Sequence, residues 1–87
     1  MAFMRERRAR VLSDAIDQLA GSSPADLPGV VHAALGNVGS YQLDAAYAVI
    51  TELSAVVRDP AALPEQVEAA RSSAVAALRP LQSDVAP

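Results

Sequence analysis

Apolar residues recur every three or four positions along most of this chain, which is the spacing of one face of an α-helix. The pattern predicts four amphipathic helices, over residues 5–20, 26–40, 41–58 and 64–80. The inward positions of the first segment are Val11, Leu12, Ala15, Ile16 and Leu19. Those of the second are Leu27, Val30, Val31, Ala34, Leu35 and Val38. Those of the fourth are Val67, Ala70, Ala74, Ala77, Leu78 and Leu81. No segment alternates with period two over a useful length, so we expect no β-sheet.

Glycine and proline mark the ends of these segments. Gly21 is expected to stop the first helix in a left-handed conformation. The second helix is expected to begin near Asp26, whose carboxylate can cap free backbone N–H groups, with Pro28 in its first turn. Pro60 ends the third helix, because the residue before a proline avoids helical angles, and Pro80 stops or kinks the fourth.

Four helices joined by short turns must run antiparallel, because a short turn returns the chain alongside the helix it leaves. The predicted fold is therefore all-α, an antiparallel up-down four-helix bundle. A chain of 87 residues has room for one core. We expect a single domain over residues 1–81, followed by a flexible C-terminal tail over residues 82–87.

The third segment is apolar on more than one side. Its main stripe is Leu43, Ala46, Tyr47, Ile50, Leu53 and Val57. Val49 and Val56 add a second flank. Such a helix is either the central element of the bundle or half-buried against another chain. The pattern leaves open whether the protein is a homodimer.

Composition excludes several kinds of site. The chain has no cysteine and one histidine, so it cannot form disulfides, thiolate sites or multi-histidine metal sites, and we expect no metal and no cofactor. No apolar run approaches the roughly 20 residues that span a bilayer, and the first ten residues lack the apolar stretch of a secretory signal. We expect a cytoplasmic protein that does not act at a membrane.

Charge is unevenly distributed along the chain. The net charge is −3, but residues 1–10 contain Arg5, Arg7, Arg8 and Arg10 against a single acid. The remainder is acidic, which argues against a nucleic-acid partner, since phosphate binding needs a basic face. We interpret the arginines as a solvated helix end, while a basic arm that docks on an acidic partner or nucleic acid is the alternative.

Catalytic arrangements are not evident, and we expect no catalytic residues and no enzyme. Asp14 with Asp17 and Glu65 with Glu68 are acid pairs, but each falls on a solvated helix face without a partner to perturb its pKa. The serines lack an elbow motif, and the glycines follow neither the P-loop nor the dinucleotide-binding pattern.

His32 is the one residue whose surroundings suggest chemistry. Taking about 100° per residue, it lies about 130° from the middle of the inner stripe of its helix, so its imidazole is expected to point outward. Gly29, Ala33 and Gly36 surround it on the outer face. An exposed imidazole can be phosphorylated on a ring nitrogen, and a glycine one turn further on leaves a hollow in which a partner's acidic site can enter.

The segment His32-Ala33-Ala34-Leu35-Gly36 resembles the motif of histidine phosphotransfer (HPt) domains, in which a phosphorylatable histidine is followed four residues later by glycine. Gly39, the stretch LDAAYAVITEL over residues 43–53 and the order of helices over residues 5–81 are also similar to that family. The resemblance implies a small helical phosphorelay protein with His32 as phosphoacceptor and a receiver-like domain as partner.

Two positions and one spacing depart from the family pattern. Leu35 stands where the family has a lysine that helps to hold the phosphoryl group, and Ala34 replaces a large apolar residue. The stretch between His32 and the next helix is also a few residues shorter than usual. These departures leave two forms of the module open, one in which His32 carries phosphate and a degenerate one that binds a receiver domain without carrying it.

We therefore expect a helical protein–protein interaction module. Its docking face is Gly29, Ala33 and Gly36 around His32. The alternative is a non-catalytic structural or regulatory bundle that acts by homo-oligomerisation, because small residues on an outer face also permit a close contact between two helices.

Overall fold

The structure, a computed structural model, describes residues 2–85 and the side chains of residues 6–83. The chain forms α1 (Ala2–Gly21), α2 (Leu27–Ser40), α3 (Asp44–Arg58) and α4 (Pro64–Leu78). A 3₁₀ turn, η1 (Arg79–Leu81), and a last helical turn, α5 (Gln82–Val85), follow. No strand occurs between residues 2 and 85, so the predicted all-α class is confirmed.

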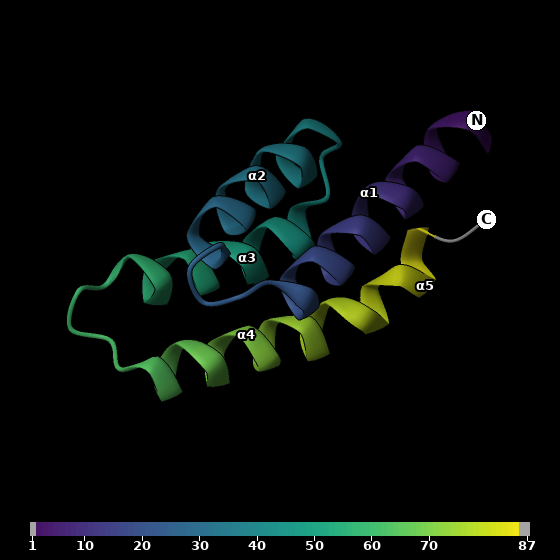
Figure 1. Cartoon of the computed structure of the whole chain (residues 1–87). Coiled ribbons are helices and arrows are strands. Elements are labelled where there is room, and N and C mark those ends of the chain that lie inside the picture. The colour runs from purple at the N-terminus through teal and green to yellow at the C-terminus, as the bar shows by residue number, and fades with distance from the viewer. Residues whose placement is uncertain (1, 86–87) are drawn as a thin grey trace.

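The four long helices run alternately in opposite directions (Figure 1). Each packs on the next helix along the chain, and α4 returns to contact α1, which confirms the predicted up-down bundle. The molecule is elongated, with principal extents of 44 × 20 × 19 Å. Figure 1 shows why: the first turns of α1 and the α5 turn continue beyond the α2–α3 pair, where α5 contacts α1.

One apolar core lies between the helices, at positions that the helical spacing predicts. Its least exposed large side chains are Leu12, Ile16, Leu19, Leu27, Val31, Val38, Ile50, Leu53 and Leu78. The inner face of α4 differs in two places, because Ala77 is exposed and Val75 is buried. Since α4 contacts both α1 and α3, its buried stripe extends to the side of Val75.

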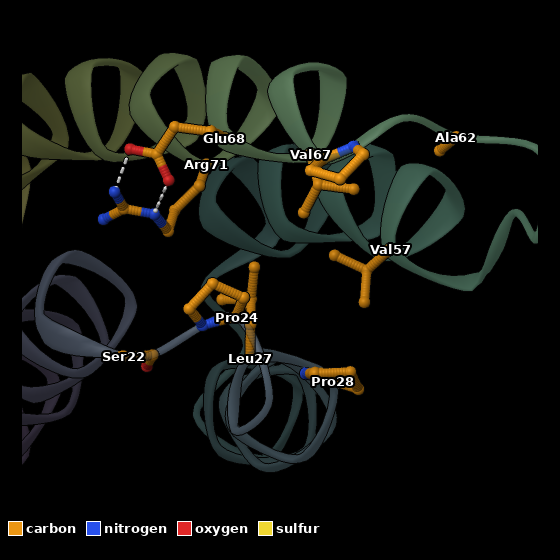
Figure 2. Close-up of a pocket in the computed structure, with 10 residues that line it drawn as sticks. Ser22, Pro24, Leu27, Pro28, Val57, Ala62, Val67, Glu68 and Arg71 are labelled. Atoms are coloured by element: carbon orange, nitrogen blue, oxygen red, sulfur yellow. Dashed lines mark hydrogen bonds and ion pairs between the residues drawn. The ribbon is translucent and has the colours of Figure 1, made fainter.

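The connection between α1 and α2 packs against the end of α3 and the start of α4 (Figure 2). Pro24 and Leu27 face Val57 and Val67 across an apolar pocket of about 270 Å³. Arg71 forms one end of this pocket. The pocket therefore lies where three helices and two connections meet, at the beginning of α2.

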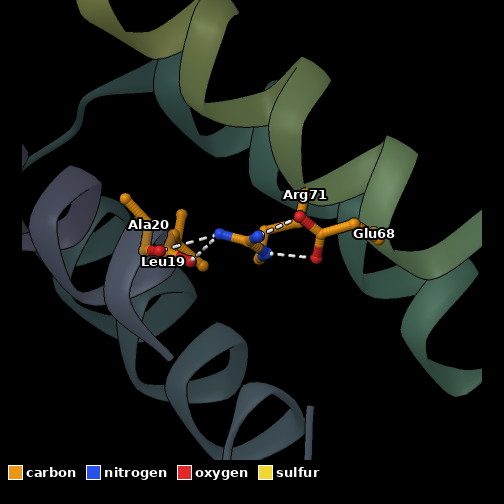
Figure 3. Close-up of polar contacts among 4 residues, drawn as sticks. All are labelled: Leu19, Ala20, Glu68 and Arg71. Carbon is orange, nitrogen blue, oxygen red and sulfur yellow. Dashed lines mark hydrogen bonds and ion pairs between the residues drawn. The ribbon is translucent and has the colours of Figure 1, made fainter. Parts of the chain in front are cut away.

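The end of α1 is stabilised by the side chain of Arg71, from α4, and not by a left-handed glycine. Gly21 is the last residue of α1, and no glycine of the described chain has a positive φ, so the predicted left-handed stop is wrong. The Arg71 Nη1 donates instead to the carbonyls of Leu19 (3.3 Å) and Ala20 (2.8 Å), while its other nitrogens bind the Glu68 carboxylate (Figure 3). The orphan carbonyls at the helix end are thus satisfied from α4.

The start of α2 is also arranged differently from the prediction. Asp26 precedes α2 in a helical conformation and makes no side-chain cap. Its carboxylate accepts a hydrogen bond from Ser23 Oγ (3.1 Å), and the N–H groups of Asp26 and Leu27 donate to the Ser23 carbonyl. Because its carboxylate is held by this turn, Asp26 does not cap, whereas Pro28 lies in the first turn of α2 as predicted.

A tight turn after α2 delays the third helix by three residues. The N–H of Leu43 donates to the Val38 carbonyl (2.9 Å), and that of Gln42 donates to the Gly39 carbonyl (3.1 Å). These two bonds form a Schellman motif, in which the residue after the helix is left-handed. Gln42 takes this conformation at φ 58°, and α3 therefore begins at Asp44 instead of residue 41.

The second apolar flank of α3 faces α4. Val49 and Val56 are half-buried and line a groove of about 300 Å³ together with Ala70 and Ala74. Contact within one chain therefore accounts for much of the two-sided pattern. The helix does not need a second copy to cover this flank.

Pro80 lies at the end of α4, as expected. The chain turns through the 3₁₀ segment Arg79–Leu81 and then forms α5 at Gln82–Val85. A helical turn in contact with α1 thus stands where a flexible tail was predicted over residues 82–87. Residues 86 and 87 lie outside the described chain.

Candidate docking face on helix α2

The outer face of α2 carries no charged side chain. Between Asp26 and Asp44 the sequence has no Asp, Glu, Lys or Arg. Because Leu27, Val31 and Val38 turn into the core, the opposite side of the helix is left in solvent. This face is therefore uncharged and exposed, on a molecule whose other helices all carry charges.

His32 lies on this face and is exposed, as its angular position predicts. Gly29, Ala33 and Gly36 are exposed beside it, so the four residues of the predicted site share one surface. A methyl group in place of the hydrogen of Gly29 or Gly36 would meet no atom within 4 Å. No contact within the chain requires glycine at either position.

The imidazole borders a shallow hollow between α2 and α3. Its lining residues are His32, Leu35, Gly36, Gly39, Ser40 and Tyr47, and its volume is about 380 Å³. The Ser40 Oγ donates to the carbonyl of Gly36 (2.8 Å), so the hydroxyl is already used within the helix. The imidazole of His32 lies against walls that are otherwise apolar or neutral.

Tyr47 belongs to this hollow, although the sequence pattern places it in the inner stripe of the third helix. Its side chain is 47% exposed, so that placement is wrong. The ring lies over Gly39 of α2: a methyl group on Gly39 would stand 3.4 Å from Cε2 and 3.6 Å from Cδ2. The missing side chain of Gly39 is the signal that could have indicated this close approach.

Leu35, which stands where the family pattern has a lysine, does not extend into solvent as a lysine would. Leu35 is half-buried, packs against the core and also lines the hollow. No charged side chain is among the lining residues. The lining of the hollow therefore offers no arginine or lysine to pair with a negative charge next to His32.

The acid pairs do not form a second site. Glu68 binds Arg71, and Glu65 is exposed in the first turn of α4. Asp14 and Asp17 are exposed on α1. No group of three or more His, Cys, Asp or Glu side chains comes together in the described part of the chain.

The basic end of α1 is only partly a solvated surface. Arg7 and Arg10 are exposed, whereas Arg8 is half-buried. The Arg8 side chain borders a hollow with Gln42 and Asp44, and its Nε has no hydrogen-bond partner among the described atoms. The side chain of Arg5 lies outside the described residues.

No family model, curated protein or solved structure matches this chain. Within the described residues, no helix is both long and apolar enough to cross a membrane.

Proposed function

We propose that this chain is a protein–protein interaction module whose partner docks on the outer face of α2, with His32 as an HPt-like phosphoacceptor. The observation that carries the proposal is the exposed imidazole of His32 beside the open side of Gly36. A partner can approach the ring nitrogens closely there, because no side chain of the chain itself stands in the way. Close approach is what phosphoryl transfer in line with the leaving oxygen requires.

The proposed step transfers a phosphoryl group from an aspartyl phosphate of a receiver-like partner. A neutral ring nitrogen of His32 forms the N–P bond while the bond between phosphorus and the aspartyl oxygen breaks, and the electron pair leaves with the carboxylate. The reverse step returns the group. Since Leu35 supplies no cation, the phosphoryl charge would be neutralised by a metal ion held in the partner's own acidic site.

The test uses the chain's single histidine. The full chain is incubated with acetyl phosphate and, separately, with a phosphorylated receiver domain, and acid-labile phosphate on the chain is measured. We expect a signal that is lost in His32→Gln, because the chain has no other histidine. A chain that neither gains phosphate at His32 nor binds the receiver domain would end this proposal.

A degenerate form of the same module would bind without transfer. Its expected result is receiver binding of equal affinity for the wild type and His32→Gln, with no acid-labile phosphate on either protein. The departure at Leu35 is the reason to test for this form, because no arginine or lysine is among the residues that line the hollow beside His32.

Homo-oligomerisation is the second candidate, and the uncharged face of α2 favours it. The chain has a net charge of −3, and α2 is the face on which two copies meet without opposing like charges. Sedimentation at micromolar to millimolar concentration tests it, with Gly36→Leu as the variant that blocks the face. A monomer over the whole range contradicts it.

A further inference from the structure

We propose that the hollow beside Arg8 is a binding site for a small monocarboxylate with a short aliphatic chain. The hollow lies where α1, the start of α3 and η1 meet, and its volume is about 220 Å³. It shares no lining residue with the hollow of His32. The inference therefore concerns a second surface of the molecule and does not depend on the proposed function.

Arg8 gives this hollow a cation without a partner. Its side chain is half-buried, yet it forms no hydrogen bond or ion pair with the described residues, and its Nε is shielded from solvent. A guanidinium N–H that is satisfied neither by the chain nor by water is unfavourable. By turning toward the hollow, Arg8 can offer its N–H groups to a carboxylate, which accepts two parallel hydrogen bonds from a guanidinium.

The walls of the hollow are suited to an aliphatic chain. Leu12 and Leu43 are buried and Leu81 is half-buried, and all three line the hollow. Taking about 30 Å³ for each water-sized group, a volume of about 220 Å³ holds about seven such groups, which is close to the size of hexanoate. Burial of the chain against leucine adds an apolar contribution to the contact with Arg8.

The charges of the lining favour an anion with a single charge. Arg8 and Asp44 are the charged residues of the lining, and no ion pair joins them. Asp44 is exposed in the first turn of α3, which has no side-chain cap, so the N–H groups of that turn also favour an anion. A dianion such as phosphate would meet one cation and the opposing carboxylate of Asp44, whereas a monocarboxylate is balanced by Arg8 alone.

The experiment is a titration of the full chain with sodium hexanoate, followed by the amide signals of the ¹⁵N-labelled protein. We expect saturable shifts at residues that line the hollow. Arg8→Met keeps an apolar stem without the charge and should bind at least about tenfold more weakly, as when a charged hydrogen bond is lost. Arg10→Met, at an exposed position of the same helix, is the matched control and should bind within about twofold of the wild type. Asp44→Asn should bind about threefold more tightly, because it removes the repelling charge.

Three further ligands separate the sources of binding. The neutral 1-hexanol, acetate and inorganic phosphate should each bind the wild type at least about tenfold more weakly than hexanoate, because each lacks the chain, the charge or the single charge that the hollow fits. Equal binding of 1-hexanol, or of acetate or phosphate, overturns the proposal, as does the absence of saturable shifts with hexanoate. An equal loss in Arg8→Met and Arg10→Met, or no gain in Asp44→Asn, also contradicts it. Each variant is checked for a cooperative urea transition, and should Arg8→Met not fold, the comparison of hexanoate with 1-hexanol on the wild type decides.

Discussion

At the scale of single residues, Gln42 is the strained position of the described chain. It takes a left-handed conformation at φ 58°, in a place where helices usually end on glycine. A residue with a Cβ is disfavoured in that region by about 1 kcal/mol or more. The turn persists because Leu43 and Val38 are both buried behind it.

Gln42→Gly is therefore expected to stabilise the fold. Relief of the left-handed strain should raise the free energy of unfolding by about 0.5–1 kcal/mol, after the greater freedom of glycine in the unfolded chain is allowed for. Urea denaturation followed by circular dichroism measures the change. Gln18→Gly, on an exposed helical position of α1, is the matched control and should lower stability by a similar amount. A loss of stability in Gln42→Gly would contradict the turn described for this residue.

Arg71 shows how one residue can decide where an element ends. Its Nη1 donates to two carbonyls at the end of α1, and its side chain is 19% exposed. We expect Arg71→Ala to lower the free energy of unfolding by about 1–2 kcal/mol, because those carbonyls lose a charged donor. The measurement is urea denaturation of the full chain.

Two controls separate the carbonyl contact from the ion pair. Glu68 is 56% exposed, so Glu68→Ala should cost only a few tenths of a kcal/mol, as exposed ion pairs usually do. Arg79→Ala, at an exposed position of η1, should change stability by less than about 0.5 kcal/mol. A loss in Glu68→Ala as large as that in Arg71→Ala would show that the ion pair is the stabilising contact.

At the scale of helices, sequence periodicity predicted most of the fold. Leu27, Val31 and Val38 could be assigned to the core from spacing, and the outward direction of His32 follows from the same geometry. The helix ends were harder to predict. Gly21 looked like a stop because nothing local shows that Arg71, 50 positions later in the chain, binds the last carbonyls of α1.

The same reasoning explains what was missed around the site. Tyr47 satisfies the spacing of the inner stripe, but the approach of α2 to α3 places its ring on Gly39 at the surface. That arrangement depends on the delayed start of α3, which depends in turn on Gln42 in a conformation seldom taken by glutamine. Contacts between helices, which a periodic pattern does not encode, therefore decided the composition of the candidate site.

Gly36 gives a prediction at the level of α2, because stability and docking should change in opposite directions. Glycine inside a helix costs about 0.5–1 kcal/mol relative to alanine, and a methyl group at Gly36 meets no atom within 4 Å. Gly36→Ala should therefore stabilise the fold by about that amount while weakening receiver binding, as the methyl group fills the space beside His32. Gly21→Ala, equally open but at the end of α1 and outside the docking face, is the control. Stabilisation without any loss of binding in Gly36→Ala would show that the partner does not use this space.

At the scale of the whole molecule, one small core supports every feature of the docking face. For a chain of 87 residues with a single apolar cluster, we expect a free energy of unfolding of only a few kcal/mol. The α2–α3 turn and the Arg71 contact each stabilise one helix end. The contact between Tyr47 and Gly39 joins α2 to α3 at one point. None of them can hold the helices together if the central contacts are lost.

Leu78 tests this dependence most directly. Its side chain is 0% exposed, at the end of α4. Leu78→Ala should cost about 2–5 kcal/mol, the usual range for a buried leucine, which is comparable with the whole stability of a domain this small. We expect the variant to lose its cooperative thermal transition and, with it, receiver binding, even though Leu78 is not among the residues that line the hollow of His32. Leu63→Ala removes the same atoms from a side chain that is 53% exposed, and it should keep both the transition and the binding. Retention of a sharp transition by Leu78→Ala would mean that α4 is not required to hold the α2–α3 pair in its docking geometry.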